Sequence, residues 1–236
     1  MAAPSLSRGG CRRHLTLVLA ELALSPVVPL RSVLIGSGGG LENQIIAIAS
    51  GGEDCTIRLW SMSTRAKNHP LIATFHGHEK TLSFLSIAWH KSSLLVSCSK
   101  DSKVKVWDTV APSSGSSSCV GSAHLNSNGP PIAMKCHESL CYIAAGAEVT
   151  AIDLRTMKKA SVLALQNHRM LSCEMMPSEW LICTGTKDRA LLWDTRKAQE
   201  LPNTVAEMQS NGPVTLLHLD QYKVVTGVPS DGQVHV

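Results

Sequence analysis

The chain has 236 residues, of which 44% are hydrophobic and 17% charged, and its formal net charge is +4. This balance predicts a folded protein with a buried core and excludes the low-hydrophobicity, high-charge composition of a disordered chain. The positive residues are scattered except for Arg8, Arg12 and Arg13, so no basic stripe indicates a nucleic-acid partner.

Residues 1–30 form a separate N-terminal segment, in which these arginines precede an apolar run over residues 15–24. The order is similar to that of a leader peptide, although Glu21 interrupts the run, which is too short to cross a bilayer. We interpret the segment as disordered, leader-like, or a remnant strand of an earlier repeat. No other segment is apolar enough to span a membrane, so no membrane partner is expected.

The eight cysteines lack the two-residue gap of a zinc knuckle, so neither a metal site nor a cofactor is expected. Cys55, Cys98 and Cys183 lie in or beside strand-like apolar runs, where a free cysteine packs as a small hydrophobe. Free cysteines favour a reducing compartment, and the expected location is therefore the cytoplasm, the nucleus or both.

Residues 31–236 repeat one pattern, in which an aspartate is followed five or six residues later by a tryptophan that closes an aliphatic or β-branched run. Three copies are complete, a partial copy stops one residue before its tryptophan, and a degenerate copy carries Ile152 at that position. The complete and partial copies are residues 54–60, 101–107, 188–193 and 231–236. The tryptophan position recurs every 41 to 47 residues, which is the range of propeller blades with four short strands each.

The second unit shows the whole pattern. Gly77-His78 opens it, and strands are predicted over residues 83–89, 94–99 and 103–107, with a turn at 100–102. Clusters of Gly, Ser, Asn and Pro between the apolar runs of the chain are typical of hairpin connections. The sequence therefore predicts antiparallel strands throughout the repeat region.

This unit resembles the WD40 repeat family, whose two signature dipeptides are matched by Gly77-His78 and Trp107-Asp108. The resemblance covers residues 31–236 and implies an all-β WD40-type propeller with about four complete blades and a truncated fifth. Such a set would be an incomplete part of a seven-bladed ring, and a small closed propeller with unusual ends is the alternative.

The resemblance also implies one buried hydrogen-bonded network per blade, formed by a His, a Ser or Thr, an Asp and a Trp. A buried aspartate needs hydrogen-bond partners, and these residue types can supply them. Carried over to this sequence, the second unit supplies His78, Ser97, Asp101 and Trp107, the fourth supplies His168, Thr184, Asp188 and Trp193, and the first supplies Ser50, Asp54 and Trp60 without a visible histidine.

Repeat arrays of this kind mostly bind other proteins, so the expected function is a non-catalytic scaffold whose partners are proteins or peptides. A narrower alternative is a substrate receptor of a cullin-type ubiquitin ligase, because residues 193–196 and 152–155 resemble the Trp-Asp-x-Arg element of such receptors. That resemblance implies that Arg196, with Arg155, faces the linker protein of the ligase. Trp180, in a turn between strands, is the aromatic candidate for contact with a partner.

A hydrolase is the third alternative, because His78, Ser97 and Asp101 have the residue types of a hydrolytic triad. No Gly-x-Ser-x-Gly motif accompanies them. The trio also recurs in part in the fourth unit, whereas a catalytic site would not be copied in each repeat. The pattern therefore favours a structural role, and no enzyme activity is expected.

Overall fold

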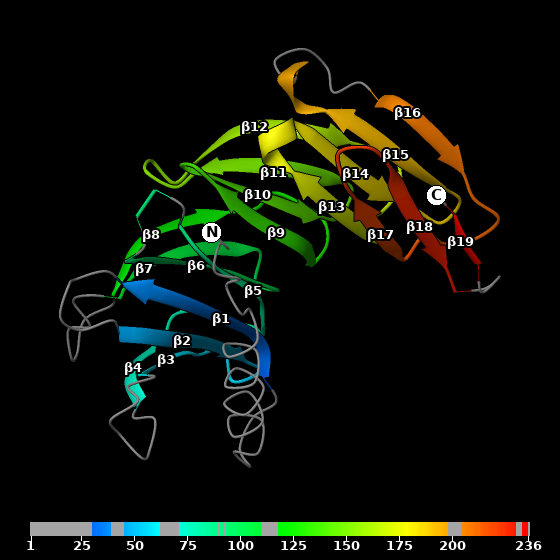
Figure 1. Ribbon diagram of the computed structural model, residues 1–236. Helices are drawn as coiled ribbons and strands as arrows, with labels where there is room; N and C mark the ends of the chain where they lie inside the picture. The colour runs from blue at the N-terminus through cyan, green and yellow to red at the C-terminus, as the bar shows by residue number, and fades with distance from the viewer. Residues whose placement is uncertain are drawn as a thin grey trace, which may run out of the picture.

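The computed structural model describes residues 30–38, 45–61, 71–88, 90–91, 93–109, 118–197, 204–229 and 233–235. These residues form four four-stranded sheets and one three-stranded sheet, all antiparallel (Figure 1). We name the sheets blade 1 to blade 5 in chain order. The predicted all-β class is confirmed, and so is the prediction of four complete blades followed by a smaller fifth. That these blades belong to a seven-bladed ring stays a prediction.

The strands follow one another along the chain and are interrupted by two short 3-10 helices, η1 (Pro177–Glu179) and η2 (Thr195–Lys197). Blades 1 to 5 are built from the following strands: β1 (Leu30–Gly38), β2 (Ile45–Gly52), β3 (Ile57–Ser61) and β4 (Leu71–Phe75); β5 (Leu82–Ile87), β6 (Leu94–Ser99), β7 (Lys103–Asp108) and β8 (Cys119–His124); β9 (Pro131–His137), β10 (Leu140–Ala145), β11 (Glu148–Asp153) and β12 (Lys158–Leu165); β13 (Ser172–Met176), β14 (Leu181–Gly185), β15 (Arg189–Asp194) and β16 (Thr204–Gln209); β17 (Leu216–Leu219), β18 (Val224–Val228) and β19 (Gln233–His235).

Each blade is a meander in which sequential strands pair, and blades 1 to 4 share an irregularity at the tryptophan position. The register between the third and fourth strands shifts next to Trp60, Trp107 and Trp193, and it also shifts next to Ile152. A β-bulge of this kind bends a strand and increases its twist. Its recurrence in blade 3 shows that Ile152 occupies the place of the tryptophan, as the repeat pattern predicted.

The blades follow one another in an open arc, with blade 1 and blade 5 at opposite ends (Figure 1). The first strands of successive blades contact each other in the order β1, β5, β9, β13 and β17, and the fourth strands lie on the outer side of the arc. Strand order and strand contacts together therefore give the arrangement of a propeller segment.

A separate hydrophobic core fills each interface between neighbouring blades. In β6, Leu95 packs in the core shared with blade 1, whereas Val96 and Cys98 pack in the core shared with blade 3. Successive residues of a strand point to opposite faces, so a strand covered on both sides buries all of them. This explains the near-continuous burial of β6, β10 and β14.

The segment predicted for residues 1–30 lies outside the described residues, apart from Leu30 at the start of β1. Within the part of the chain that the structure describes, no helix is long and apolar enough to cross a membrane.

Candidate functional site

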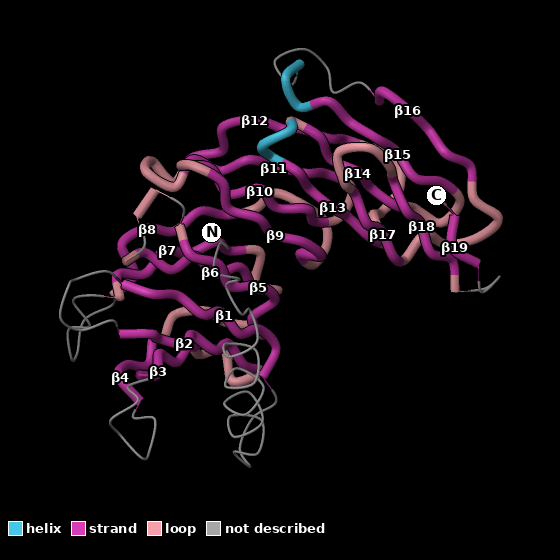
Figure 2. The backbone as a smooth tube through the Cα atoms, viewed as in Figure 1, coloured by secondary structure: helices cyan, strands magenta, loops and turns pink. Residues whose placement is uncertain are grey.

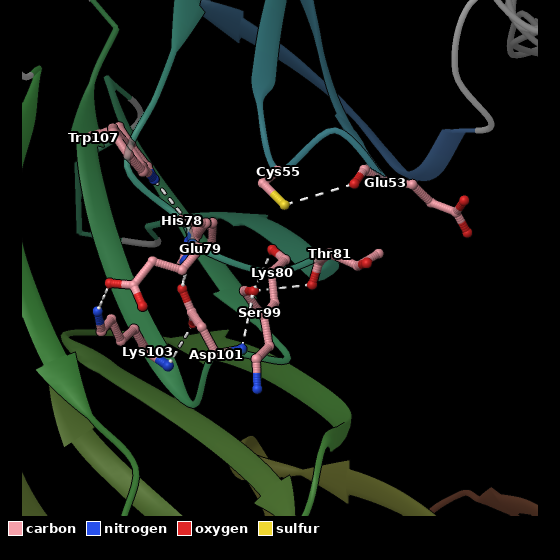
Figure 3. Close-up of polar contacts among 11 residues, drawn as sticks. Glu53, Cys55, His78, Glu79, Lys80, Thr81, Ser99, Asp101, Lys103 and Trp107 are labelled. Carbon is pink, nitrogen blue, oxygen red and sulfur yellow. Dashed lines mark hydrogen bonds and ion pairs between the residues drawn. The ribbon is translucent and has the colours of Figure 1, made fainter.

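In blade 2, four side chains form one continuous chain of hydrogen bonds. Trp107 Nε1–H donates to Ser97 Oγ over 2.8 Å, and Ser97 Oγ lies 2.7 Å from His78 Nε2. His78 Nδ1 lies 2.9 Å from Asp101 Oδ2, and Figure 3 shows Trp107, His78 and Asp101 following one another. An ionised carboxylate only accepts, so Nδ1 carries the proton of His78 and the hydroxyl of Ser97 donates to Nε2. The indole N–H, the hydroxyl and both imidazole nitrogens of this network therefore all have hydrogen-bond partners.

The network joins two blades. Ser97 and Trp107 lie on β6 and β7, and Asp101 lies in the turn between these strands. His78 lies in the connection between β4 of blade 1 and β5 of blade 2. The hydrogen bonds therefore fix the connection between the blades onto the buried strands of blade 2.

Backbone groups and a second serine hold Asp101 in place. Its carboxylate accepts the backbone N–H of Glu79 over 3.0 Å and that of Lys103 over 2.8 Å. Ser99, which the sequence analysis did not select, has its Oγ 2.7 Å from the carbonyl oxygen of Lys80 and accepts the backbone N–H of Asp101 (Figure 3). Lys103 also forms an exposed ion pair with Glu79.

Burial and hydrogen bonding set the charge states of the network. Burial lowers the pKa of His78 and outweighs the opposing effect of the hydrogen bond with Asp101. Burial by itself would raise the pKa of Asp101, but hydrogen bonds from His78 and from the backbone N–H groups of Glu79 and Lys103 lower it overall. The pair is thus a neutral imidazole next to a carboxylate, and the network carries one negative charge.

The contacts from Ser97 through His78 to Asp101 follow the order of a hydrolytic triad. However, Ser97 has 0% exposed surface, and its Oγ accepts the indole N–H of Trp107. A substrate carbonyl cannot approach an oxygen that is enclosed in this way. The arrangement of these three residues therefore suits the support of the strands.

In blade 4 the structure assembles a different network from the predicted one. Trp193 Nε1–H donates to Thr184 Oγ1 over 2.9 Å, and the Thr184 hydroxyl donates to Gln166 Oε1 over 3.4 Å. Gln166 thus occupies the role expected of His168, whose side chain is exposed. The carboxylate of Asp188 is held by Arg189 and Thr186 instead, and these hydrogen bonds lower its pKa to about 2.

Blades 1 and 3 differ from blade 2 in the contacts of their described side chains. In blade 1, Asp54 accepts the backbone N–H of Thr56 and forms an ion pair with Arg58, and Trp60 is partly buried. The side chain of Ser50 lies outside the described residues. In blade 3, Ile152 is buried at the tryptophan position and has no side-chain donor.

One edge of blades 4 and 5 carries an exposed set of residues, Trp180, Arg196 and Tyr222, which we call the rim surface. Trp180 ends η1 and is 50% exposed, and its carbonyl oxygen accepts the backbone N–H of Thr195, which begins η2. Tyr222 is 92% exposed, and its neighbour Gln221 contacts Glu179 of η1 over 3.3 Å. Figure 2 shows the two helical turns together at this edge of the arc.

Tyr222 was not selected from the sequence. The sequence feature that could have indicated it is a large aromatic residue in a polar turn, because such a residue is expected to be exposed and not buried in a hydrophobic core. The contact of its turn with η1, through Gln221 and Glu179, depends on the packing of blade 5 against blade 4.

Arg155 and Arg196 occupy equivalent positions after the third strands of blades 3 and 4. Each donates its backbone N–H to the aspartate two residues earlier, Asp153 over 2.8 Å and Asp194 over 3.0 Å. Each guanidinium also pairs with that aspartate, while the arginine side chains stay 67% and 66% exposed. The two arginines therefore present similar, oriented positive groups to solvent.

No group of three His, Cys, Asp or Glu side chains in the described ranges is arranged to hold a metal ion. The seven cysteines of these ranges are free thiols, and Cys98, Cys141 and Cys183 are buried.

Comparison with known proteins agrees with this architecture. The model of the family "WD domain, G-beta repeat" matches residues 30–61 and 69–108. The nuclear distribution protein PAC1 of Komagataella phaffii is 35% identical over 97 residues, and the F-box/WD repeat-containing protein sel-10 of Caenorhabditis elegans is 34% identical over 67 residues. These alignments cover 39% and 28% of this chain, and the chain spans only 19% and 11% of the two relatives.

A similar fold over most of the chain is also found in a solved structure. The crystal structure of the computationally designed Ika8 protein superposes with a TM-score of 0.64 over 87% of this chain and 70% of the designed one, at 15% sequence identity. At that identity the likeness concerns the fold alone. The family match falls on the strands of blades 1 and 2, and the signature dipeptides and the blade architecture agree with it, so this part of the chain consists of WD40 repeats and the sheets are arranged as consecutive propeller blades.

Proposed function

We propose that this protein is a non-catalytic scaffold that binds other proteins or peptides through the rim surface. The observation that carries this proposal is the grouping of Trp180, Arg196 and Tyr222 on turns that are hydrogen-bonded to one another. Exposed Trp, Tyr and Arg side chains are the residues that most often dominate binding energy at protein interfaces. Turns fixed by a rigid β framework also lose little entropy when a partner binds.

Quantitative affinity capture tests this proposal with three forms of the protein. A Trp180→Ala/Tyr222→Ala double variant removes the aromatic groups of the rim surface, whereas Val120→Ala removes an exposed side chain from β8 of blade 2. Proteins that bind through the rim surface should be retained by the wild type and by Val120→Ala and depleted at least about tenfold by the double variant. An unchanged set of captured proteins in all three forms, at equal thermal stability, would refute the use of this surface.

A second candidate function is that of a substrate receptor for a cullin-type ubiquitin ligase. It is supported by the matching geometry of Arg155 and Arg196 and by the similarity to sel-10, an F-box/WD repeat-containing protein. A guanidinium that is oriented by one carboxylate keeps further N–H groups with which it can bind a carboxylate of the linker protein.

Pulldown of the ligase linker protein separates this candidate from the general scaffold. The Arg155→Ala/Arg196→Ala double variant should lose the linker protein, whereas Arg169→Ala, which changes an exposed arginine of the β12–β13 connection, should keep it. If the wild type does not capture the linker protein, or if all forms capture it equally, the receptor function is refuted and the scaffold proposal is unaffected.

We also infer that the protein works in the cytoplasm or the nucleus. The buried free thiols of Cys98, Cys141 and Cys183 support a reducing compartment. A fluorescent tag placed after residue 236 should therefore report cytoplasmic or nuclear signal. Signal confined to mitochondria or to the secretory pathway would contradict this location and would favour a leader role for residues 1–30.

A further inference from the structure

Blade 4 contains a cavity of about 320 Å³ next to its tryptophan. One wall is formed by the end of β12 and the following connection, residues 165–168, and the opposite wall by Arg189, Leu191 and Trp193 of β15. Thr204 and Glu207 of β16, both exposed, complete the lining. The cavity therefore combines an apolar surface, from Leu191 and Trp193, with amide, guanidinium and carboxylate groups.

Comparison of the two networks shows what blade 4 lacks. In blade 2 the hydrogen bonds run from the indole N–H through the hydroxyl and the imidazole to the carboxylate of Asp101. In blade 4 they run from Trp193 through Thr184 to Gln166 Oε1 and stop there, because Asp188 pairs with Arg189. Gln166 Nε2 is buried without a hydrogen-bond partner. A buried donor without an acceptor is costly, so this nitrogen gains free energy from any acceptor that reaches it.

The charges around the cavity restrict what that acceptor can be. Arg189 already pairs with two carboxylates, those of Asp188 and Glu207. A third carboxylate would therefore meet two negative groups at a guanidinium that is already neutralised. A neutral group is preferred, and a primary carboxamide fits best. Its carbonyl oxygen can accept from Gln166 or Arg189, while its NH₂ group can donate to the carboxylate of Glu207.

We propose that this cavity binds the side-chain carboxamide of a glutamine or asparagine in a partner protein. The methylene groups of the incoming side chain pack on Leu191 and Trp193, and its amide pairs with the amide of Gln166. The terminal torsion of a glutamine is soft, so the Gln166 amide can turn toward the occupant. The proposal rests on the scaffold function in one respect, namely that a partner protein supplies the carboxamide. Binding of small-molecule probes to the cavity does not depend on such a partner.

Three blocked amino acids of matched shape provide the probes: N-acetyl-glutamine amide, N-acetyl-methionine amide and N-acetyl-glutamic acid α-amide. The measurement follows the assigned indole N–H resonances of ¹⁵N-labelled protein. Trp193 lines the cavity, so its resonance should shift and saturate with the glutamine probe at roughly millimolar concentration. Trp107 donates to Ser97 beside His78 in the filled network of blade 2, so its resonance serves as the internal control.

The methionine and glutamate probes should bind about tenfold more weakly, because the first cannot form the hydrogen bonds and the second brings an unpaired negative charge. Equal binding of all three probes would overturn the proposal, because it would assign recognition to the backbone amides that they share. Absence of a saturable Trp193 shift with the glutamine probe would also overturn it. Neither result bears on the capture experiment at the rim surface.

Two variants test whether the change in the Trp193 resonance arises from binding in the cavity. Thr204 is exposed, so Thr204→Phe can place a ring in the cavity without disturbing the buried core, and it should abolish binding of the glutamine probe. Gln166→Met removes the amide at nearly constant volume and should make the methionine probe bind at least as well as the glutamine probe. An undiminished glutamine preference in both variants would place the binding site elsewhere and refute the proposal.

Discussion

At the scale of single residues, Ser97 holds the centre of the blade 2 network. Its hydroxyl accepts from Trp107 and donates to His78, and both of these side chains are buried. Loss of the hydroxyl would therefore leave a buried donor and a buried acceptor unsatisfied at once. This is the situation in which removal of one hydrogen-bonding group costs the most free energy.

Ser97→Ala is accordingly expected to lower the free energy of unfolding by about 1–3 kcal/mol. Urea denaturation measures the change, and Ser122→Ala, which alters an exposed serine of β8, should stay within about 0.5 kcal/mol of the wild type. A hydrolase would instead lose turnover without a large loss of stability, so an equally stable Ser97→Ala protein would contradict the structural role.

The lowered pKa of His78 predicts a particular dependence of stability on pH. Between the ordinary value of 6.5 and the lower pKa of the folded state, the unfolded chain binds a proton that the folded chain does not. The free energy of unfolding should therefore be highest above pH 6.5 and should fall as the pH is lowered through this window.

Urea midpoints measured at intervals from about pH 7.5 to about pH 5 would show this decline. His78→Gln should flatten the curve over the same range, although the variant is less stable throughout. The carboxylate of Asp101 does not interfere, because its pKa is lowered from 3.8 and lies below this pH range. A wild-type curve as flat as that of the variant would contradict a neutral, buried His78.

At the scale of the strands, the end of the second strand of blade 4 limits how closely blades 4 and 5 approach. Gly185, at the end of β14, lies against the neighbouring blade: a Cβ atom there would stand 2.3 Å from Ser172 Oγ and 2.6 Å from the carbonyl oxygen of Val214. The Ser172 hydroxyl itself donates to that carbonyl over 2.6 Å. The absence of a side chain at this position therefore permits both the contact between blades 4 and 5 and the hydrogen bond.

Gly185→Ala should lower the free energy of unfolding by about 1–3 kcal/mol, because backbone atoms of the connection between the blades must move. The matched control is Gly227→Ala in β18, where the nearest atom is Leu216 Cβ at 3.2 Å. At 3.2 Å this neighbour must move by only a small fraction of an ångström, so the variant should cost less than about 1 kcal/mol. Thermal or urea unfolding of both proteins checks the contrast, and equal losses would contradict it.

At the scale of the whole molecule, the blades differ in how many neighbours they have. Blade 3 contributes to hydrophobic cores on both of its faces, whereas the described residues of blade 5 share a core with blade 4 alone. In a repeat array, stability is approximately a sum of contributions from each unit and from its interfaces. Blade 5 should therefore open more often than blade 3.

Amide hydrogen exchange would detect this difference. The amides of β10, a strand buried from Cys141 to Ala145, should exchange at least about tenfold more slowly than those of β18. Both strands are the second of their blades and are paired on both sides, which makes them a matched comparison. Equal exchange rates would indicate that the blades unfold as one cooperative unit.

The sequence by itself determined the strands, the turns and the number of blades. Alternation of apolar and polar residues, and turn residues between the runs, act over a few positions and can be read directly from the chain. The strand expected near Leu94 is β6, and the strand closed by Trp107 is β7. The place of Ile152 could also be predicted, because the spacing of the repeat fixes it.

Only the tertiary structure decided which side chains meet between the blades. It buried Ser97 completely, gave Gln166 the role expected of His168, and brought the turn that carries Tyr222 into contact with η1 through Gln221 and Glu179. These outcomes depend on how the connection between two strands sits against the next sheet, and therefore on contacts between residues distant in the sequence. Local patterns cannot determine such contacts, because several neighbouring residues of a connection can reach the same position.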